Sequence, residues 1–244
     1  MKETNFIFGI RPVIEALEAG KTFDKILIKK GLNNELSREL YSTLRTFNVP
    51  YQFVPYQKID RLTQKNHQGV IGFISPIQFH DIDEIVTRIY EQGESPFIVV
   101  LDGVTDVRNF GAIARTVECA GAHAILIPEK GAAQVNADAI KTSAGALHTV
   151  PVCRANNLEK AVKNLKNNGL SIYVASEKSE SLYYEADFKE PFALVMGAED
   201  KGVSIKLRAL SDFSLKIPIS GKIKSLNVSV AAGILMYEAL KQRI

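Results

Sequence analysis

The stretch Ile217–Leu240, IPISGKIKSLNVSVAAGILMYEAL, decides how we interpret the fold of this chain. It begins at the end of an apolar segment, Phe213–Pro218, which we predict to be a strand. It then breaks at Ser220 and Gly221 into a basic turn, Lys222–Lys224, and continues into a helix. A strand, a glycine turn and a helix in succession direct free backbone N–H groups towards one point, which favours a ligand site at this junction.

The predicted helix has both a start signal and an apolar periodicity. We predict Ser225 as its N-cap and Asn227 as part of its first turn, because both side chains can accept hydrogen bonds from free backbone N–H groups. Its predicted buried face has helical spacing. That face consists of Leu226, Val230, Ile234 and Leu235. A turn without a ligand could be built from less distinctive residues, so we favour a function for Ser225 and Asn227 that is compatible with capping.

Length and composition indicate a folded protein of one or two α/β domains. The chain has 244 residues, of which 46% are hydrophobic, and this argues against disorder. Its net charge of +3 permits RNA binding without requiring it. We expect a cytoplasmic protein without a membrane segment, because the sequence has neither a signal pattern nor a long apolar run, and its two cysteines form no disulfide framework.

Several common chemistries lack their sequence signals here. The four histidines and two cysteines show no metal-ligand spacing, so we predict no metal site. Neither a G-x-G-x-x-G nor a G-x-x-x-x-G-K-[ST] motif is present, which argues against dinucleotide and P-loop nucleotide binding. No G-x-S-x-G motif indicates a serine hydrolase. A generic α/β enzyme acting on small molecules is therefore disfavoured.

Residues 1–75 are predicted to form a small α/β domain. Amphipathic helical spacing at Glu35–Phe47 accompanies a shorter helix at Ile10–Ala19 and short strand-like segments. A polar loop, Arg61–Val70, is either a solvated turn, which is the simpler interpretation, or a contact for RNA phosphates and bases. The RNA-contacting interpretation rests on Arg61, Lys65, Asn66, His67 and Gln68.

Residues 76–96 are predicted to be a linker, and residues 97–244 a second domain. The linker prediction rests on Pro76, Pro96 and the sequence between them, which includes only one helix-like run. From Phe97 onward, strand and helix signals alternate, which indicates a mostly parallel sheet with helices on both faces. Ligands bind beyond the carboxyl ends of the strands in such sheets.

Unusual residues follow three of these apolar strands. They are Asn109 and Arg115 after FIVVL, Gly197 and Glu199 after FALVM, and Ser225 and Asn227 after FSLKIPI. Each has a plain structural explanation by itself: Asn109 as an N-cap, Arg115 as a surface residue and Glu199 as part of a solvated turn. Because all three groups fall just beyond strand ends, we predict that they share one site.

These residues lie in segments that resemble a known family. NFGAIART, MGAEDKGVS and IPISGKIKSLNVSVAAG resemble the three motifs of the SpoU class (TrmH type) of SPOUT RNA 2′-O-ribose methyltransferases. Residues 1–75 are similar to the family's small substrate-binding domain, which is related to ribosomal protein L30e. GIRPVIEAL, HQGV and KTSAGALHTVPV resemble the bacterial branch that methylates a guanosine in 23S rRNA.

The resemblance implies a fold, a cofactor and an assembly. It implies an α/β SPOUT domain with a parallel sheet and a deep trefoil knot, a rare exception to unknotted topology, preceded by the L30e-like domain. S-adenosylmethionine would lie in the knot, and the protein would be a homodimer whose active site uses both subunits. The residues implied for cofactor binding are Gly197, Ile217, Ile219 and Leu226.

The same resemblance implies catalytic roles for Arg115, Asn109, Glu199, Ser225 and Asn227. Arg115 would approach the ribose 2′-hydroxyl, and we favour positioning over proton abstraction because a guanidinium has a pKa of about 12 or higher. Asn109 and Glu199 would organise Arg115, and Ser225 and Asn227 would shape the methyl-transfer site. A tRNA methyltransferase of the same class and a non-catalytic RNA-binding relative remain as alternatives.

Overall fold

The structure is a computed structural model that describes residues 6–47, 49–223 and 225–244. The chain divides into two compact units, Met1–Gln78 and Phe79–Ile244. The predicted basic turn ends at Lys224, which lies outside the described residues. Among the residues described, every helix falls short of the length and apolar character needed to cross a membrane.

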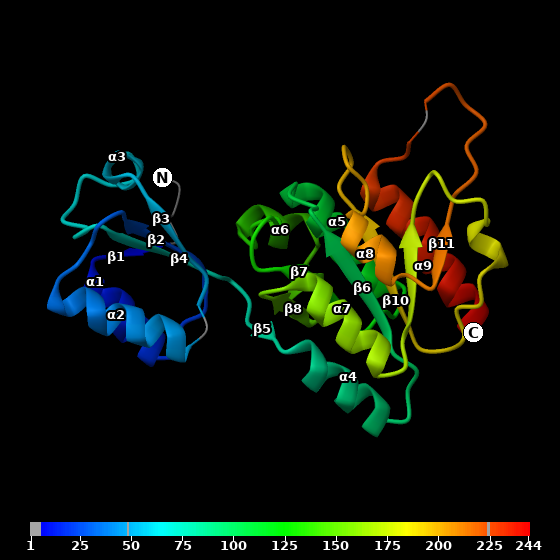
Figure 1. The fold of residues 1–244 in the computed structure, drawn as a ribbon, viewed down its shortest axis with the longest axis horizontal. Helices are drawn as coiled ribbons and strands as arrows, with labels where there is room; N and C mark the ends of the chain where they lie inside the picture. Colours follow the sequence, from blue (N-terminus) through cyan, green and yellow to red (C-terminus); the bar gives the residue numbers. More distant parts are fainter. Residues whose placement is uncertain (1–5, 48, 224) are drawn as a thin grey trace. The chain divides into compact units, whose positions relative to one another are not determined.

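The first unit contains a four-stranded sheet with the order β1-β4-β2-β3 (Figure 1). Its strands are β1 (Phe6–Phe8), β2 (Phe23–Lys29), β3 (Tyr51–Val54) and β4 (Val70–Ile74). Its helices are α1 (Ile10–Glu18), α2 (Glu35–Thr46) and α3 (Tyr56–Asp60). Strand β4 is antiparallel to both β1 and β2, whereas β2 and β3 run parallel.

The two faces of this sheet are covered unequally. On one face, α1 and α2 enclose the larger core, in which Ile14, Ile26 and Leu40 are buried. On the other face, the short helix α3 contributes Ile59 to a smaller cluster with Leu27. The side chain of Asn34 caps α2 by accepting a hydrogen bond from the Ser37 N–H, which explains why this helix begins where the amphipathic pattern predicted.

The second unit contains a seven-stranded sheet with the order β11-β9-β10-β6-β7-β8-β5. Its strands are β5 (Phe79–His80), β6 (Phe97–Asp102), β7 (Ala124–Pro128), β8 (Val152–Ala155), β9 (Ser171–Ala175), β10 (Phe192–Gly197) and β11 (Phe213–Leu215). All neighbouring strands are parallel. The central strands are buried along almost their whole length, which fits their continuous apolar sequences. The predicted parallel α/β architecture is confirmed.

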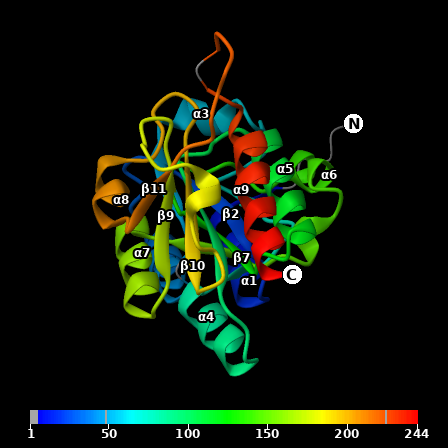
Figure 2. The same ribbon diagram turned by 90° about the vertical axis from the view of Figure 1, so that its right-hand side faces the viewer.

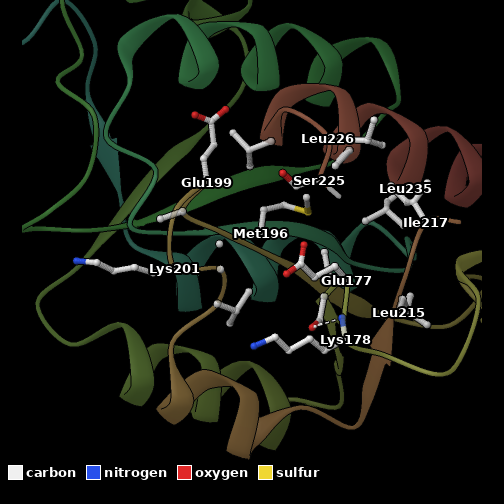
Figure 3. A pocket seen from close by; sticks show the side chains of 18 of the residues that line it. Glu177, Lys178, Met196, Glu199, Lys201, Leu215, Ile217, Ser225, Leu226 and Leu235 are labelled. Atoms are coloured by element: carbon white, nitrogen blue, oxygen red, sulfur yellow. Dashed lines mark hydrogen bonds between the residues drawn. The ribbon is translucent and has the colours of Figure 1, made fainter. Parts of the chain in front are cut away.

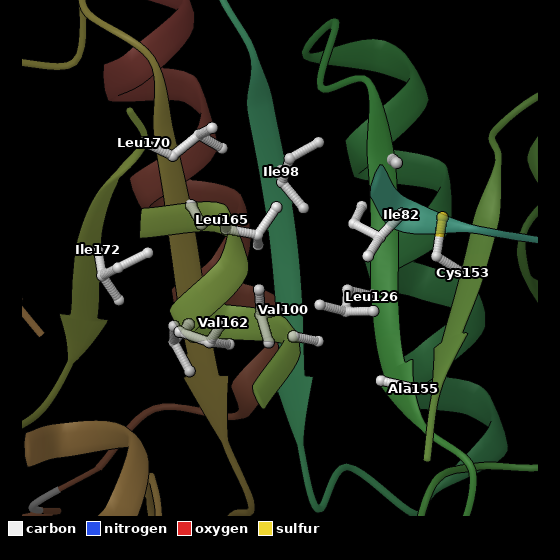
Figure 4. Packing of buried hydrophobic residues seen from close by; sticks show 14 of the residues in the cluster. Ile82, Ile98, Val100, Leu126, Cys153, Ala155, Val162, Leu165, Leu170 and Ile172 are labelled. Atoms are coloured by element: carbon white, nitrogen blue, oxygen red, sulfur yellow. The ribbon is translucent and has the colours of Figure 1, made fainter. Parts of the chain in front are cut away.

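Helices cover both faces of this sheet. They are α4 (Ile82–Glu91), α5 (Val107–Cys119), α6 (Ala137–Thr142), α7 (Leu158–Asn167), α8 (Ile205–Leu210) and α9 (Val228–Arg243), with 3₁₀ turns at Ala146–His148 and Tyr183–Glu185. Figure 2 shows α7 and α8 on one side of the sheet and α5, α6 and α9 on the other. The core under α4 and α7 packs Val162 and Leu165 against Ile98 and Val100 of β6 (Figure 4).

The linker predicted over residues 76–96 is largely folded structure of the second unit. Strand β5 pairs in parallel with β8, and α4 buries Ile82, Ile85 and Ile89 in the core that it shares with α7. The apolar spacing of α4 already indicated a buried helix face. Pro76 and Pro96 mark only the ends of this segment and do not make it a linker.

The last helix starts later than predicted, and of its predicted buried face Leu235 is buried, whereas Leu226 and Val230 are exposed. Strand β11 ends at Leu215, and α9 begins at Val228 rather than at Leu226. Val230 is 52% exposed, whereas Ala232, Leu235 and Met236 are buried. Apolar and small residues occur on all sides of α9, so periodicity alone could not identify its buried face.

Candidate active site

A cavity of about 250 Å³ lies beside the carboxyl ends of β9, β10 and β11 in the second unit. Its apolar lining includes Met196, Leu215 and Leu235, which come from two strands and from α9 (Figure 3). The charged residues that line it are Glu177, Lys178, Glu199, Asp200, Lys201 and Arg208. Parallel strands place their carboxyl ends at one edge of a sheet, which is why residues far apart in the sequence meet here.

Six of the nine residues predicted for catalysis or cofactor binding line this cavity. They are Gly197, Glu199, Ile217, Ile219, Ser225 and Leu226. Ile219 and Leu226 are each 39% exposed although both are large and apolar. Exposed apolar side chains along the wall of a cavity are typical of a surface that a ligand covers.

Gly197 ends β10 at a point where the backbone has no room for a side chain. A Cβ atom at this position would overlap the backbone of Gly202 and Val203. The loop folds back because the Gly202 N–H donates to the Ala198 carbonyl at 2.7 Å, and the Ser204 N–H donates to the Asp102 Oδ2 at 2.7 Å. Glycine at 197 is therefore required for the loop that forms one wall of the cavity.

Glu199 is the centre of a hydrogen-bond network that joins three distant segments. Its Oε1 accepts from the Asn109 Nδ2 at 3.1 Å and from the Asn227 Nδ2 at 2.6 Å. The Asn227 Nδ2 also donates to the Asn109 Oδ1 at 3.0 Å. The carboxylate points towards α5, on which Asn109 lies (Figure 3). These three residues, predicted to share a site, are brought together.

The helix caps differ from the prediction. Asn227, not Ser225, caps α9, with its Oδ1 accepting from the backbone N–H groups of Ser229 and Val230. Asp106, not Asn109, caps α5, with its Oδ1 accepting from the Asn109 N–H at 2.8 Å. The Asn109 side chain is thus free of a capping role and contacts Glu199, while Asn227 caps α9 and binds Glu199 at the same time.

Asn109, Asn227 and Arg115 do not line the cavity; the first two are joined to it through Glu199, whereas Arg115 is not. It lies exposed on α5, and it does not belong to the cavity lining. Within residues 6–47, 49–223 and 225–244, no side chain forms a hydrogen bond or ion pair with it. Six residues along a helix turn a side chain well away from the face of Asn109, which explains the separation.

Several lining residues were missed by sequence reasoning. Ser176, Glu177 and Lys178 follow β9, and Arg208 lies on α8. The strand Ser171–Ala175 was predicted, so the rule that directed attention to the ends of other strands could have found the polar residues after it. Arg208 had no such signal because α8 does not follow directly from a strand.

In the first unit, the polar loop Arg61–Val70 presents some predicted residues and buries another. Arg61 and Lys65 are exposed, and Gln68 is exposed while its Oε1 accepts from the Ile10 N–H at 3.0 Å. His67 is only 3% exposed, and its Nδ1 accepts from the Gly69 N–H. The predicted contact between His67 and RNA is therefore corrected, because this imidazole supports the loop from inside.

The residues that the structure describes contain no cluster of three or more histidine, cysteine or carboxylate side chains able to hold a metal ion. Burial in an apolar environment raises the pKa of the Cys153 thiol to about 12, more strongly than the charge of nearby Asp81 does. That thiol is inert, and it packs in the core on the far side of the sheet from α5 and α9.

Two sequence families match this fold and site. The profile of the SpoU rRNA Methylase family matches residues 96–237. A profile described as RNA 2′-O ribose methyltransferase substrate binding matches residues 6–80. The chain therefore belongs to the SpoU family of RNA methyltransferases, and the predicted family is confirmed.

Relatives match over nearly the whole chain. YacO of Bacillus subtilis, assigned to the TrmH family of tRNA/rRNA methyltransferases, is 31% identical over 99% of this chain and 97% of its own length. A protein of Staphylococcus saprophyticus with the same assignment is 34% identical over 97% and 95% of the two chains. The crystal structure of the SpoU methyltransferase AviRb from Streptomyces viridochromogenes, in complex with the cofactor AdoMet, is also similar. It has a TM-score of 0.62 and 26% identity, covering 98% of this chain and 90% of that chain.

Proposed function

We propose that this protein transfers a methyl group from S-adenosylmethionine to a ribose 2′-hydroxyl of RNA. The observation that carries this proposal is the Glu199–Asn109–Asn227 network at the rim of the cavity beside β10. Such a network fixes polar groups where a reacting hydroxyl has to be positioned. Membership of the SpoU family and the AdoMet complex of AviRb support the choice of cofactor.

The cavity lining suits the two chemical halves of this cofactor. We assign Ile217, Ile219 and Leu226 to the adenine, because they form an apolar wall, and Gly197 to the loop that closes the pocket. Charged groups of both signs, such as Glu177 and Lys178, can pair with the amino and carboxylate groups of the methionine part. When bound, the cofactor supplies a methyl group on an activated sulfonium.

The protein's own contribution is alignment of the ribose. Glu199 is held by two amide N–H donors, so its carboxylate stays in one place, with its second oxygen available to orient a cationic or hydroxyl group. Asn227 couples this carboxylate to the first turn of α9, and Ser225 lies beside it on the cavity wall. Because the methyl donor is already activated, positioning accounts for most of the catalysis.

Arg115 is proposed to orient the 2′-hydroxyl and to stabilise its developing negative charge. Its exposed position on α5, outside the cavity of its own chain, supports a homodimer in which Arg115 reaches the active site of the other copy. A guanidinium offers hydrogen-bond donors and no acceptor, so Arg115 is proposed to act by hydrogen bonding rather than as a base. The trefoil knot and the dimer both remain predictions.

For the substrate, we favour a guanosine in 23S rRNA, modified in the cytoplasm. The segments GIRPVIEAL, HQGV and KTSAGALHTVPV support this choice. The second candidate is a tRNA. It is favoured by a structure described as the A. aeolicus TrmH/SpoU tRNA modifying enzyme, which is 32% identical over 66% of this chain, with a TM-score of 0.56.

Methyl transfer from labelled S-adenosylmethionine to bulk 23S rRNA and to tRNA tests these assignments, with Arg115→Ala as the inactive control. Label in rRNA that makes one guanosine resistant to alkaline cleavage would support the full proposal. Label in tRNA alone would retain the chemistry and replace the substrate. Failure to bind S-adenosylmethionine in calorimetry would overturn the proposal and favour a non-catalytic RNA-binding protein.

A further inference from the structure

The first unit contains a second cavity, of about 440 Å³, between the end of β2, α3 and the loop before β4. Lys29, Tyr56, Gln64, Lys65 and Asn66 are among the residues that line it. Its volume falls in the range of about 300–1,000 Å³ that is typical of sites for small molecules and ligand groups. None of the proposed catalytic residues is among its lining residues, so its lining requires a separate explanation.

The cavity is lined by the aromatic ring of Tyr56, which is not part of the buried core. Tyr56 is 45% exposed, and its ring packs on the buried His67 imidazole with centroids 5.1 Å apart. The Lys29 Nζ lies 5.5 Å from the centre of the same ring. An ammonium held over an aromatic ring shows that the π-system is accessible to a polar partner. An exposed tyrosine held from below is the kind of surface on which a nucleobase stacks.

The loop beside this ring is held in an uncommon backbone conformation. Gln68 has a φ of 51°, which is unusual for a residue other than glycine, and its Oε1 accepts from the Ile10 N–H. Gly69 has a φ of 81°, and its carbonyl accepts from the Lys29 N–H at 2.8 Å. Strained backbone that is fixed by several contacts is a feature of preorganised binding sites.

The charges around the cavity suit a phosphate backbone. Lys29 and Lys65 are both exposed at its edge, and Asp60 is the single carboxylate in its lining. The Asp60 Oδ1 lies 3.7 Å from the His67 Nε2, on the side of the buried imidazole. The amide side chains of Gln64 and Asn66 add donors and acceptors that can contact base edges.

We propose that this cavity binds one unpaired nucleotide of the substrate RNA, with its base stacked on Tyr56 and the flanking phosphates at Lys29 and Lys65. The proposal rests on the proposed function in one respect, namely that the substrate is RNA. A base inside a duplex is already stacked and cannot lie flat on a protein ring, so the site selects single-stranded segments. On binding, the base takes the place of the Lys29 ammonium over the ring, and the ammonium turns to a phosphate.

The test uses the full chain and a short, unstructured, fluorescein-labelled RNA, with affinity measured by fluorescence anisotropy. Tyr56→Ala should weaken binding about 5- to 150-fold, the range found when an aromatic platform for one base is removed. Tyr56→Phe keeps the ring and should bind like the wild type. Phe47→Ala is the matched control. Phe47 is 47% exposed in the same unit, but it lies between α2 and β3, whereas Tyr56 lies after β3.

Salt dependence tests the lysines separately. Lys29→Gln and Lys65→Gln should each reduce the slope of log affinity against log salt by about 0.7, as expected for one lost phosphate contact on a single strand. Unchanged affinity of Tyr56→Ala, or equal binding of single-stranded and duplex RNA by the wild type, would overturn the proposal. Wild-type methyl transfer, measured in parallel, distinguishes this failure from failure of the proposed function.

Discussion

The two cavities of this protein are built in opposite ways. The cavity beside β10 draws its lining from Ala175 to Leu235, and the network at its rim reaches back to Asn109. The cavity of the first unit is lined mainly by the short segment Tyr56–Gly69, with Lys29 and Leu32 added. One site is assembled from the ends of β9, β10 and β11 together with α9, whereas the other is mainly a local structure of one helix and one loop.

This difference matches the demands of the two proposed tasks. Methyl transfer requires a hydroxyl held in line with the donor, and displacements of about 1 Å can cost on the order of 10²-fold in rate. Strand ends and the Glu199 network provide such fixed positions. Stacking and phosphate contacts tolerate small movements, since every base presents a π-face. Exposed lysines around Tyr56 are sufficient for that purpose.

The largest expected effect is on the active site, from Arg115→Lys. A lysine keeps the charge but loses the planar pair of donors that can hold a hydroxyl and a phosphate together. We expect kcat to fall by about 10²–10³-fold, the usual cost of removing one donor to a developing oxyanion. Binding of S-adenosylmethionine should not change, because Arg115 lies outside the cofactor cavity.

Arg88→Lys is the matched control for this prediction. Arg88 is also an exposed arginine on a helix, but α4 lies on the opposite face of the sheet from α5. Its conversion to lysine should leave the rate of methyl transfer unaltered. Full activity of Arg115→Lys in the same assay would show that charge alone is needed and would refute the bidentate role.

The next-largest effect is expected at Gly197, where the end of β10 fixes the loop that forms one wall of the cavity. In Gly197→Ala, the new methyl group would overlap the backbone of Gly202 and Val203, so the loop has to move. We expect S-adenosylmethionine binding to be lost in calorimetry and the free energy of unfolding to fall by about 1–3 kcal/mol.

Gly221→Ala provides the comparison, since a Cβ at that position would meet no heavy atom within 4 Å. It should bind the cofactor as the wild type does. Normal binding by Gly197→Ala would mean that the loop between Ala198 and Val203 is more adaptable than its contacts with β10 indicate, and that the contrast between the two cavities is weaker.

The sequence predicted the parallel sheet and the meeting of Asn109, Glu199 and Asn227, because both follow from local patterns. Continuous apolar runs define buried strands, and parallel strands bring their carboxyl ends to one edge. Polar residues beyond β6, β10 and β11 are therefore expected to approach one another. Their hydrogen bonds confirm that expectation.

The sequence could not predict features that depend on tertiary packing. Ser225 and Asn227 are both good cap residues, and only the position of α9 against its neighbours selects Asn227. His67 looked like a surface histidine in a polar loop, yet it is buried under Tyr56. Asn109 and Arg115 lie on different faces of α5, and motif spacing alone does not specify which face of this helix meets the cavity.

A smaller effect is expected from Gly69→Ala, in the cavity of the first unit. Alanine at a φ of 81° is strained by about 1–2 kcal/mol, and its Cβ would lie 2.9 Å from the Lys29 Cβ. We expect RNA affinity to fall several-fold while S-adenosylmethionine binding remains normal. Gly31→Ala has a similar positive φ but no neighbour within 4 Å, so it separates the strain from the contact with Lys29. Equal RNA affinities for the two variants would argue against a preorganised loop.

The smallest expected effect concerns Asp212, which fixes the start of β11 and thus the chain that leads to Ile217. Its Oδ2 accepts from the Ile172 N–H at 2.9 Å, and its Oδ1 accepts from the Lys166 Nζ at 2.6 Å. Burial alone would raise the pKa of Asp212, but the hydrogen bonds from Lys166 and Ile172 outweigh it and hold the pKa below the ordinary value of 3.8. Asp212→Asn should cost about 1 kcal/mol at neutral pH, because the pair is partly exposed.

The pH dependence of that cost follows from the direction of the pKa shift. A depressed carboxyl pKa contributes stability that is fully present above the unfolded-state pKa and is lost as the pH falls through the folded-state pKa. The difference between wild type and Asp212→Asn in urea unfolding should therefore be constant near neutral pH and shrink below pH 3.8. Glu159→Gln is the control, since its ion pair with Lys206 is exposed and spans 3.3 Å; it should change stability little at any pH. A difference for Asp212→Asn that persists in acid would mean that the charge on Asp212 is not what holds β11 in place.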